Sequence, residues 1–310
     1  MPRTIDLLNQ RADLNSAIRD YFKKTGVLEV STPVLSFSGN TDPAIDSFQT
    51  IQQKTMYLHT SPEFFMKRLL VEGSGSIYQI CPVFRAEESG RQHNPEFTML
   101  EWYRVGYDYK QLMDDVAALI NEVSGREFVI KKLSYQQAFS GYGIDPHSAD
   151  ISTLKQLAGD NGIDLHSPQA LSRDNWLELI MSQLIEPQFA EDCLTFIYDY
   201  PASQASLAKV RQGEIAVAER FELYWGCLEL ANGFTELLDA DEQLSRFEAE
   251  NEKRRVNAQS LVPVDQHFIA ALRAGMPACS GVALGIDRLL MCLTGAAQIK
   301  EVMPFPIQQV

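Results

Sequence analysis

The sequence has 310 residues and a mass of 34.9 kDa, and its 27 basic and 41 acidic side chains give a formal charge of −14. With 45% hydrophobic and 22% charged residues, the chain has enough apolar material for a sizeable core, which excludes an intrinsically disordered protein. Its first residues lack the apolar run of a secretory signal, and no stretch approaches the roughly 20 apolar residues that span a bilayer, so we expect a cytoplasmic protein.

Several common kinds of site are also excluded. The five cysteines are scattered and form no CxxC pair, which argues against a disulfide framework or a structural zinc site. The sequence has no GxxxxGK[ST] loop, no GxGxxG after a strand, no HExxH pair and no GxSxG elbow. The acidic charge weakens the case for nucleic-acid binding, because phosphate contacts need a basic surface.

In chain order, apolar residues first recur at helical intervals over 5–22, and Gly26 stands where a C-terminal cap is expected, so the pattern predicts an opening amphipathic helix. A short strand over 27–30 follows and stops before Thr32 and Pro33. Segments 55–59, 76–87 and 97–104 are rich in β-branched and aromatic residues. Turn-forming residues separate the last two segments, which predicts an antiparallel hairpin with a long loop.

The second half of the chain continues this alternation. Helical patterns cover 108–125 and 150–190, a strand over 194–200 ends at Pro201, and strands recur between 215 and 237. Helices are predicted over 241–259, over 265–274 and from Ile286. Since no flexible linker appears, we expect one α+β domain over 1–310, with a central antiparallel β-sheet flanked by helices and a mainly helical insertion at about 125–190.

The predicted hairpin is polar where sheet residues are usually apolar. Arg85 and Glu87 are two residues apart and so share one face of a strand. Further polar and aromatic side chains come from the loop and the returning strand, namely Arg91, His93, Asn94, Phe97, Glu101 and Tyr103. Arginine that clamps phosphate and a ring that stacks on a base would suit a nucleotide. The alternative is a surface hairpin with an ordinary ion pair.

Two further clusters lie near the C-terminus. Glu222, Glu229 and Glu236 recur every seven residues, and glycines at 226 and 233 permit the bends that would bring them together. Converging carboxylates need Mg²⁺ or an amine to neutralise them, unless they form only a solvated acidic face. In CSGVALGIDRLLMCL a glycine-rich strand enters a helix, where Arg288 would reach a triphosphate; tight packing is the alternative.

Together, these segments resemble the class II aminoacyl-tRNA synthetases, specifically the lysyl branch. Motif 1 is carried by FKKTGVLEVSTPVL with Pro33, motif 2 by FRAEESGRQHNPEFTMLEWY and motif 3 by GVALGIDRL. The segments SPEFFMKRLL, TFIYDYPASQASLAKV and ERFELYWGCLELANGFTEL also match, so the resemblance covers nearly the whole chain except roughly 125–190. It implies a class II synthetase catalytic domain that dimerises through residues 5–35.

A lysyl-tRNA synthetase carries an anticodon-binding barrel before motif 1, whereas here motif 1 begins within the first 25 or so residues. The chain therefore resembles the stand-alone paralogues of that enzyme. The resemblance implies ATP-dependent activation of (R)-β-lysine and its transfer to a lysine ε-amine of translation elongation factor P, without stable tRNA binding. Ser61 and Ala283 replace an alanine and a glycine of the lysyl enzymes beside the amino-acid pocket.

The resemblance also implies roles for individual residues. Arg85 and Arg288 would be catalytic. The residues implied to bind ATP are Arg85, Glu87, His93, Asn94, Phe97, Glu229, Leu230, Gly285 and Arg288. Those implied to bind the amino acid are Ser61, Pro62, Glu63, Glu101, Tyr103, Asn232, Phe234, Glu236 and Ala283. Glu222 and Glu229 would hold Mg²⁺. A truncated synthetase that charges tRNA and a non-catalytic regulatory paralogue remain as alternatives.

Overall fold

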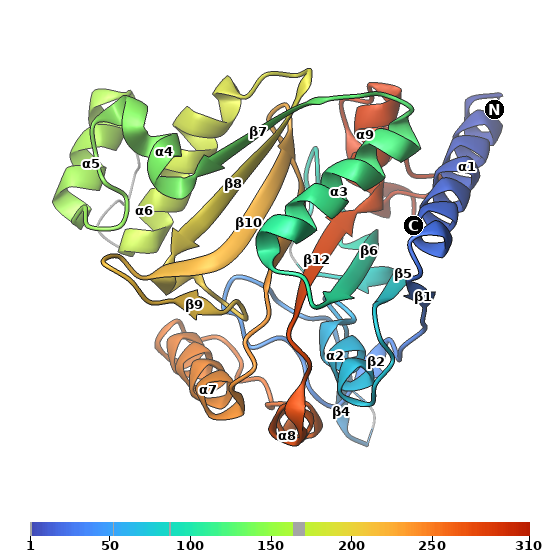
Figure 1. The fold of residues 1–310 in the computed structure, drawn as a ribbon, viewed down its shortest axis with the longest axis horizontal. Helices are drawn as coiled ribbons and strands as arrows, with labels where there is room; N and C mark the ends of the chain where they lie inside the picture. The colour runs from blue at the N-terminus through green and yellow to red at the C-terminus, as the bar shows by residue number, and fades with distance from the viewer. Residues whose placement is uncertain (1, 52, 87, 164–170) are drawn as a thin grey trace. The chain divides into compact units, whose positions relative to one another are not determined.

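The computed structural model describes residues 2–51, 53–86, 88–163 and 171–310. The chain forms two compact units, the first made of residues 1–126 and 235–310 and the second of residues 127–234 (Figure 1). Each unit contains β-sheet flanked by helices, and most strand pairs are antiparallel, as predicted.

The main sheet of the first unit has the order β1-β5-β6-β12. Its strands are β1 (Leu28–Glu29), β5 (Ile77–Phe84), β6 (Glu96–Val105) and β12 (Cys279–Gly285). The predicted hairpin is confirmed, because β5 and β6 pair in antiparallel register with Gln79 opposite Glu101. On its other side β6 pairs with β12, which places Ala283 opposite Glu101. A smaller sheet joins β2 (Leu35–Ser36), β4 (Thr55–Leu58) and β3 (Gln49–Ile51).

Helices near the two ends of the chain lie side by side in this unit (Figure 1). The helices of the first unit are α1 (Pro2–Lys24), α2 (Glu63–Val71), α3 (Tyr109–Ser124), α7 (Ala240–Val256), α8 (Gln266–Gly275) and α9 (Ile286–Thr294), with short 3-10 turns η6 (Ile299–Glu301) and η7 (Ile307–Gln309). Of these, α1 lies beside α9. Arg11 of α1 pairs with Asp287 of α9, and Asp287 also accepts the backbone N–H of Thr98 in β6 at 2.7 Å. The buried Asp287 therefore fixes the start of α9 against the sheet.

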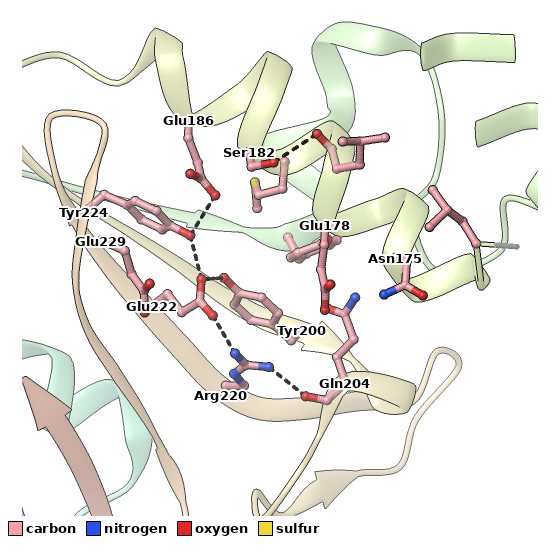
Figure 2. Close-up of a pocket in the computed structure, with 14 residues that line it drawn as sticks. Asn175, Glu178, Ser182, Glu186, Tyr200, Gln204, Arg220, Glu222, Tyr224 and Glu229 are labelled. Carbon is pink, nitrogen blue, oxygen red and sulfur yellow. Dashed lines mark hydrogen bonds and ion pairs between the residues drawn. The ribbon is translucent and has the colours of Figure 1, made fainter. Parts of the chain in front are cut away.

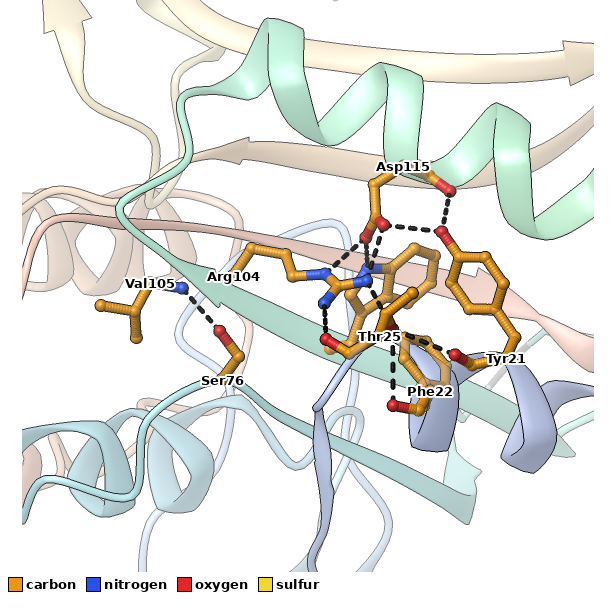
Figure 3. A network of polar contacts seen from close by, with 8 residues as sticks. Tyr21, Phe22, Thr25, Ser76, Arg104, Val105 and Asp115 are labelled. Carbon is orange, nitrogen blue, oxygen red and sulfur yellow. Dashed lines mark hydrogen bonds and ion pairs between the residues drawn. The ribbon is translucent and has the colours of Figure 1, made fainter.

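A second buried ion pair joins α3 to β6 (Figure 3). The guanidinium of Arg104 donates to both carboxylate oxygens of Asp115, at 2.7 and 2.6 Å. Asp115 accepts two more hydrogen bonds, from the Tyr21 hydroxyl at 2.7 Å and the Trp102 indole at 2.9 Å. Arg104 also donates to Thr25 at the end of α1, so this network links three elements of the first unit.

The second unit carries a sheet of order β11-β10-β8-β7, with β9 paired to β10. Its strands are β7 (Val129–Ser134), β8 (Cys193–Pro201), β9 (Val210–Arg211), β10 (Val217–Trp225) and β11 (Leu228–Thr235), whose last residue falls in the first unit. Its helical segments are α4 (Tyr135–Phe139), η1 (Ser140–Tyr142), α5 (Ile151–Asp160), α6 (Arg173–Ile180), η3 (Met181–Ile185), η4 (Glu186–Gln188) and η5 (Ala202–Gln204). A core that includes Trp176, Ile180 and Ile197 packs these helices on the sheet.

The predicted elements are found close to their expected positions. The differences concern short or solvated strands. Strand β7 lies within the insertion expected to be mainly helical, and three of its six residues, Val129, Lys131 and Lys132, are exposed, so its sequence lacks an apolar run. The part of the predicted 150–190 helical region that spans 164–170 lies outside the described residues. The prediction of a single domain is not tested by the division into two units, and it stays a prediction.

Candidate functional site

The start of α2 brings three of the predicted amino-acid-binding residues together in the first unit. Pro62 stands at the N-cap, and the backbone N–H of Glu63 donates to the Ser61 hydroxyl oxygen at 3.0 Å. The Ser61 hydroxyl in turn donates to Glu101 Oε2 at 2.6 Å. One small polar side chain therefore links the first residue of α2 to the middle of β6.

Glu101 is 3% exposed and is held from two sides. Its other oxygen, Oε1, accepts the Tyr103 hydroxyl at 2.7 Å from the same face of β6. Burial, reinforced by the charge of Glu63, raises the pKa of Glu101 to about 7, although the two hydroxyl donors oppose the shift. Ala283 lies opposite Glu101 on β12, so its methyl group is on the same face of the sheet as this carboxylate.

The third carboxylate of this cluster, Glu236, meets a buried lysine. Its oxygen Oε2 lies 2.5 Å from Lys67 Nζ, and the same ammonium lies 2.6 Å from Glu63 Oε1. Glu236 reaches this position because its backbone N–H donates to the Cys279 carbonyl oxygen at the start of β12. Its second oxygen, Oε1, is buried and has no hydrogen-bond partner among the described residues.

The charges in this cluster act on one another. Burial alone would lower the pKa of Lys67, but the charges of Glu236 and Glu63 outweigh it and raise that pKa. For Glu236 the effect of burial prevails. Burial and the neighbouring acids Glu63 and Glu101 outweigh the charge of Lys67 and raise the pKa of Glu236 to about 8. One ammonium thus does not neutralise three carboxylates, and the cluster retains a proton near neutral pH.

Gly281 makes room for this arrangement. A Cβ added there would fall 2.6 Å from Glu236 Oε1 and would collide with the ring of Tyr103. By contrast, a Cβ added at Gly285 would meet only the Arg288 side chain, at an ordinary distance of 3.7 Å. The protein's own packing therefore requires glycine at 281 but not at 285.

Arg85, at the end of β5, has the features of a ligand-binding arginine. Its guanidinium lies over the Phe97 ring at 5.2 Å and forms a weak contact of 3.4 Å with Glu88. Its Nε is buried, yet no described residue accepts a hydrogen bond from it. Arg85 and Phe97 are therefore adjacent, as predicted. The buried Nε of Arg85 can donate a hydrogen bond to a ligand.

His93 and Arg288 are also brought together. Arg288 Nη2 lies 2.7 Å from His93 Nε2, and Arg288 Nε donates to the Gln92 carbonyl oxygen at 3.3 Å. Burial, together with the positive charges of Arg288 and Arg85, lowers the pKa of His93. The imidazole is therefore neutral at pH 7 and able to accept from the guanidinium.

Two other predicted ATP contacts are less informative. Asn94 is buried, donates to the Glu96 carbonyl oxygen at 2.6 Å and accepts the backbone N–H of Ile307 at 3.0 Å, so it anchors the C-terminal turn. Its expected contact with adenine stays a prediction. Glu87 lies outside the described residues.

The second unit has a cavity of about 530 Å³ (Figure 2). It is lined by the acids Glu178, Glu186, Glu222 and Glu229, by Arg220, and by residues that include Tyr200 and Tyr224. Glu222 and Glu229 both line this cavity, and Gly226, with φ of +56°, turns β10 back into β11 between them. Gly226 is thus one place where a positive φ is needed. Glu236, the third acid expected to join them, is not among the lining residues and pairs with Lys67 instead.

Figure 2 shows that Glu222 is surrounded by donors. Tyr200 and Tyr224 donate to its Oε2 at 2.7 and 2.6 Å, and Arg220 Nη2 lies 2.5 Å from its Oε1. Arg220 also donates to Asn232 Oδ1 at 3.1 Å. Leu230 is buried, and Phe234 packs against the core of the second unit.

Glu222 and Glu229 have the chemistry that a nucleotide-bound magnesium ion requires. Carboxylate oxygens are hard donors, and a nucleotide-bound Mg²⁺ commonly uses one or two of them with several waters. Glu222 and Glu229 supply such a pair on one cavity wall. Within the described ranges no group of three or more acids, histidines or cysteines is arranged to hold a metal without a second ligand such as phosphate.

Sequence reasoning assigned no role to Lys67, Arg220 or Gly281. The first lies within the quoted segment SPEFFMKRLL, four residues after Glu63, which is the spacing of a helical ion pair. That spacing is the signal that identifies Lys67, but a helical lysine is usually solvated. Arg220 lies two residues before Glu222, so both share a strand face.

Comparison with known proteins gives a consistent result. The family profile described as tRNA synthetases class II (D, K and N) matches residues 2–309. A protein of Vibrio atlanticus (strain LGP32) is 47% identical over 98% of this chain and 96% of its own length. Proteins of Pectobacterium atrosepticum and Yersinia enterocolitica are both 46% identical, over 97% of this chain and 95% and 94% of their own lengths. All three are named elongation factor P–(R)-beta-lysine ligase.

Among the described residues, no helix has the length and apolar character needed to cross a membrane. The α+β architecture, the predicted motifs and the match over almost every residue agree with one another. The chain belongs to the class II tRNA synthetase family of the D, K and N group.

Proposed function

We propose that this protein is an ATP-dependent ligase that activates (R)-β-lysine as an acyl-adenylate and transfers it to a lysine ε-amine of translation elongation factor P. The observation that carries the proposal is the identity of 46–47% with relatives of that name over 94–96% of their length. The buried cluster of Glu63, Glu101 and Glu236 supports it, because a diamino acid needs more than one acidic contact.

In the first half-reaction the substrate carboxylate attacks the α-phosphate of ATP and pyrophosphate leaves. This step needs no general base, because the carboxylate is already ionised at neutral pH. Catalysis is therefore positioning and charge neutralisation. The unpartnered buried Nε of Arg85 supports a role in bridging the carboxylate and the α-phosphate.

Arg288 would bind the β- and γ-phosphates together with His93, which holds its guanidinium at 2.7 Å. Phe97 would stack on adenine, and Gly285 would leave room for the nucleotide. Glu229 and Glu222 would hold Mg²⁺, which neutralises phosphate charge when bound.

In the second half-reaction a neutral lysine ε-amine of the acceptor attacks the adenylate carbonyl carbon. An amide forms, AMP leaves with the bonding electron pair, and the amine loses a proton. We further propose a cytoplasmic homodimer through residues 5–35, where Ile5, Leu8, Leu28 and Leu35 are exposed apolar side chains. Their exposure supports an interface on α1 and the segment that follows it.

ATP–pyrophosphate exchange tests the activation step. We expect exchange to depend on the amino acid and to be faster with (R)-β-lysine than with α-lysine. Arg85→Ala should abolish exchange and leave the fold intact, whereas Arg273→Ala, at a solvated ion pair of the same unit, should retain it. Preference for α-lysine would favour a truncated synthetase, and no exchange with either amino acid would favour a non-catalytic paralogue.

A further inference from the structure

Lys67 is buried within the acidic cluster that Glu63, Glu101 and Glu236 form in the first unit. Its side chain is 1% exposed, and its ammonium bridges Glu63 and Glu236 at 2.6 and 2.5 Å. The ammonium also lies 5.8 Å from the centroid of the Phe268 ring on α8. An ammonium removed from water this completely is stable only beside compensating negative charge, so Lys67 and the acids around it are one electrostatic unit.

The charges around Lys67 do not balance. Every neighbouring element contributes: Glu63 and Lys67 come from α2, Glu101 and Tyr103 from β6, Cys81 from β5, Glu236 from the segment after β11, and Cys279 from β12. Burial raises the pKa of the tyrosine and of both thiols, so these three groups are neutral. Three ionised carboxylates and one ammonium leave a net charge of −2, from −3 + 1.

We infer that Lys67 is a positioning residue that sets the net charge of the acidic cluster around it, which we call the amine pocket. A ligand with two ammonium groups would neutralise this charge. By holding Glu63 and Glu236 on one ammonium, Lys67 also fixes the distance between two of the carboxylates that would receive the ligand. This inference rests on the proposed function only for the identity of the ligand, a diamino acid.

A consequence is that ligand binding expels protons. Without ligand, protons bound to Glu101 and Glu236 offset the excess negative charge, because the pKa values of these groups lie at about 7 and 8. Two ligand ammonium groups replace those protons. Diamine affinity should therefore rise with pH through this range, by about tenfold per pH unit for each proton released.

A merely structural lysine would behave differently. If Lys67 only packs α2 against α8, its replacement lowers stability and leaves the pH dependence of binding unchanged. If it sets the pocket charge, its removal leaves three carboxylates with no internal cation. The pKa values of the acids then rise further, and binding moves to higher pH.

Isothermal titration calorimetry with the full-length protein tests this inference. (R)-β-lysine and α-lysine are titrated between pH 6 and pH 9 in buffers of different ionisation enthalpy, which gives both Kd and the number of protons released. The variants are Lys67→Met and the solvated control Lys253→Met, with thermal unfolding of each to establish folding.

For the wild type and Lys253→Met we expect proton release of about one or more at pH 7 and Kd at least tenfold lower at pH 8 than at pH 6. Lys67→Met should weaken binding at pH 7 at least tenfold and shift the Kd profile to higher pH by about one unit.

Binding without proton release in the wild type would overturn the inference, even if Lys67→Met failed to fold. An unshifted profile in folded Lys67→Met would overturn it as well. Proton-coupled binding of α-lysine but not of (R)-β-lysine would uphold the inference while contradicting the proposed function. Binding of (R)-β-lysine that is independent of pH would contradict the inference and support the proposed function.

Discussion

Two of the buried ion pairs in the first unit, Arg104–Asp115 and the Lys67 cluster, differ in charge balance. In one, Arg104 donates two hydrogen bonds to Asp115, and Tyr21 and Trp102 donate to the same carboxylate. One cation faces one anion, and each carboxylate oxygen of Asp115 has donors (Figure 3). In the other, Lys67 faces three carboxylates, and Glu236 Oε1 has no hydrogen-bond partner among the described residues.

Similar burial thus accompanies opposite electrostatic states. A complete and neutral network fixes α1, α3 and β6 to one another and leaves nothing for a ligand to satisfy. An incomplete and acidic network costs stability in the free protein and is relieved by a cation. The difference teaches that an excess of one charge, more than burial itself, separates a candidate binding cluster from a structural one.

Breaking the balanced pair should give the largest effect on stability. Arg104→Met leaves Asp115 as an uncompensated buried charge, so we expect the free energy of unfolding to fall by about 3–5 kcal/mol. Urea denaturation measures this loss. Diamine affinity of the folded variant should stay within about twofold of the wild type, since folded-state binding does not involve this pair. A loss below about 1 kcal/mol would mean that the network is not structural.

The unbalanced cluster should make stability depend on pH in the opposite sense to an ordinary acidic pair. The folded-state pKa of Glu101 is about 7 and that of Glu236 about 8, against an ordinary value of 4.5 for an unperturbed glutamate. Their contribution is fully present below pH 4.5 and is lost as the pH rises to 8, because the folded state holds protons that the unfolded chain has released.

Measured without ligand, the unfolding free energy of the wild type should therefore decline from pH 5 to pH 8 relative to that of Glu236→Gln, by about 2 kcal/mol. A saturating diamine should flatten the decline. Parallel pH profiles for the two proteins would contradict the raised pKa of this carboxyl group.

Glu236→Gln should have the smallest effect on stability and a selective effect on substrate. The amide has nearly the same shape as the acid but cannot neutralise an ammonium, so we expect KM for the diamine to rise about tenfold to thirtyfold, or about 1.4–2 kcal/mol. KM for ATP should change much less. Amino-acid-dependent pyrophosphate exchange measures both constants, and an equal rise in the two would argue against a contact between Glu236 and the amine.

Where the sequence succeeded, a local period or a motif carried the information. The hairpin of β5 and β6 follows from two apolar strands with a turn-rich loop, and the contact between His93 and Arg288 agrees with the shared phosphate role that the resemblance implies. The convergence of Glu222 and Glu229 follows from Gly226.

Where the sequence failed, the missing information was tertiary. Lys67 is the one buried lysine in the described part of the chain, and nothing in the α2 sequence EFFMKRLLV shows that its ammonium meets Glu236, which is far away in sequence. The same holds for the hydroxyls of Tyr200 and Tyr224 on Glu222. The short strands β2, β3 and β9 have too few residues to show a period.

The acceptor of the activated amino acid gives the most direct test of the account. Purified protein is incubated with ATP, Mg²⁺ and radiolabelled (R)-β-lysine, with elongation factor P and tRNA present in the same reaction. We predict that label appears on elongation factor P in an acid-stable amide and that tRNA remains unlabelled. Label on tRNA, or no transfer to elongation factor P despite pyrophosphate exchange, would contradict the proposed function.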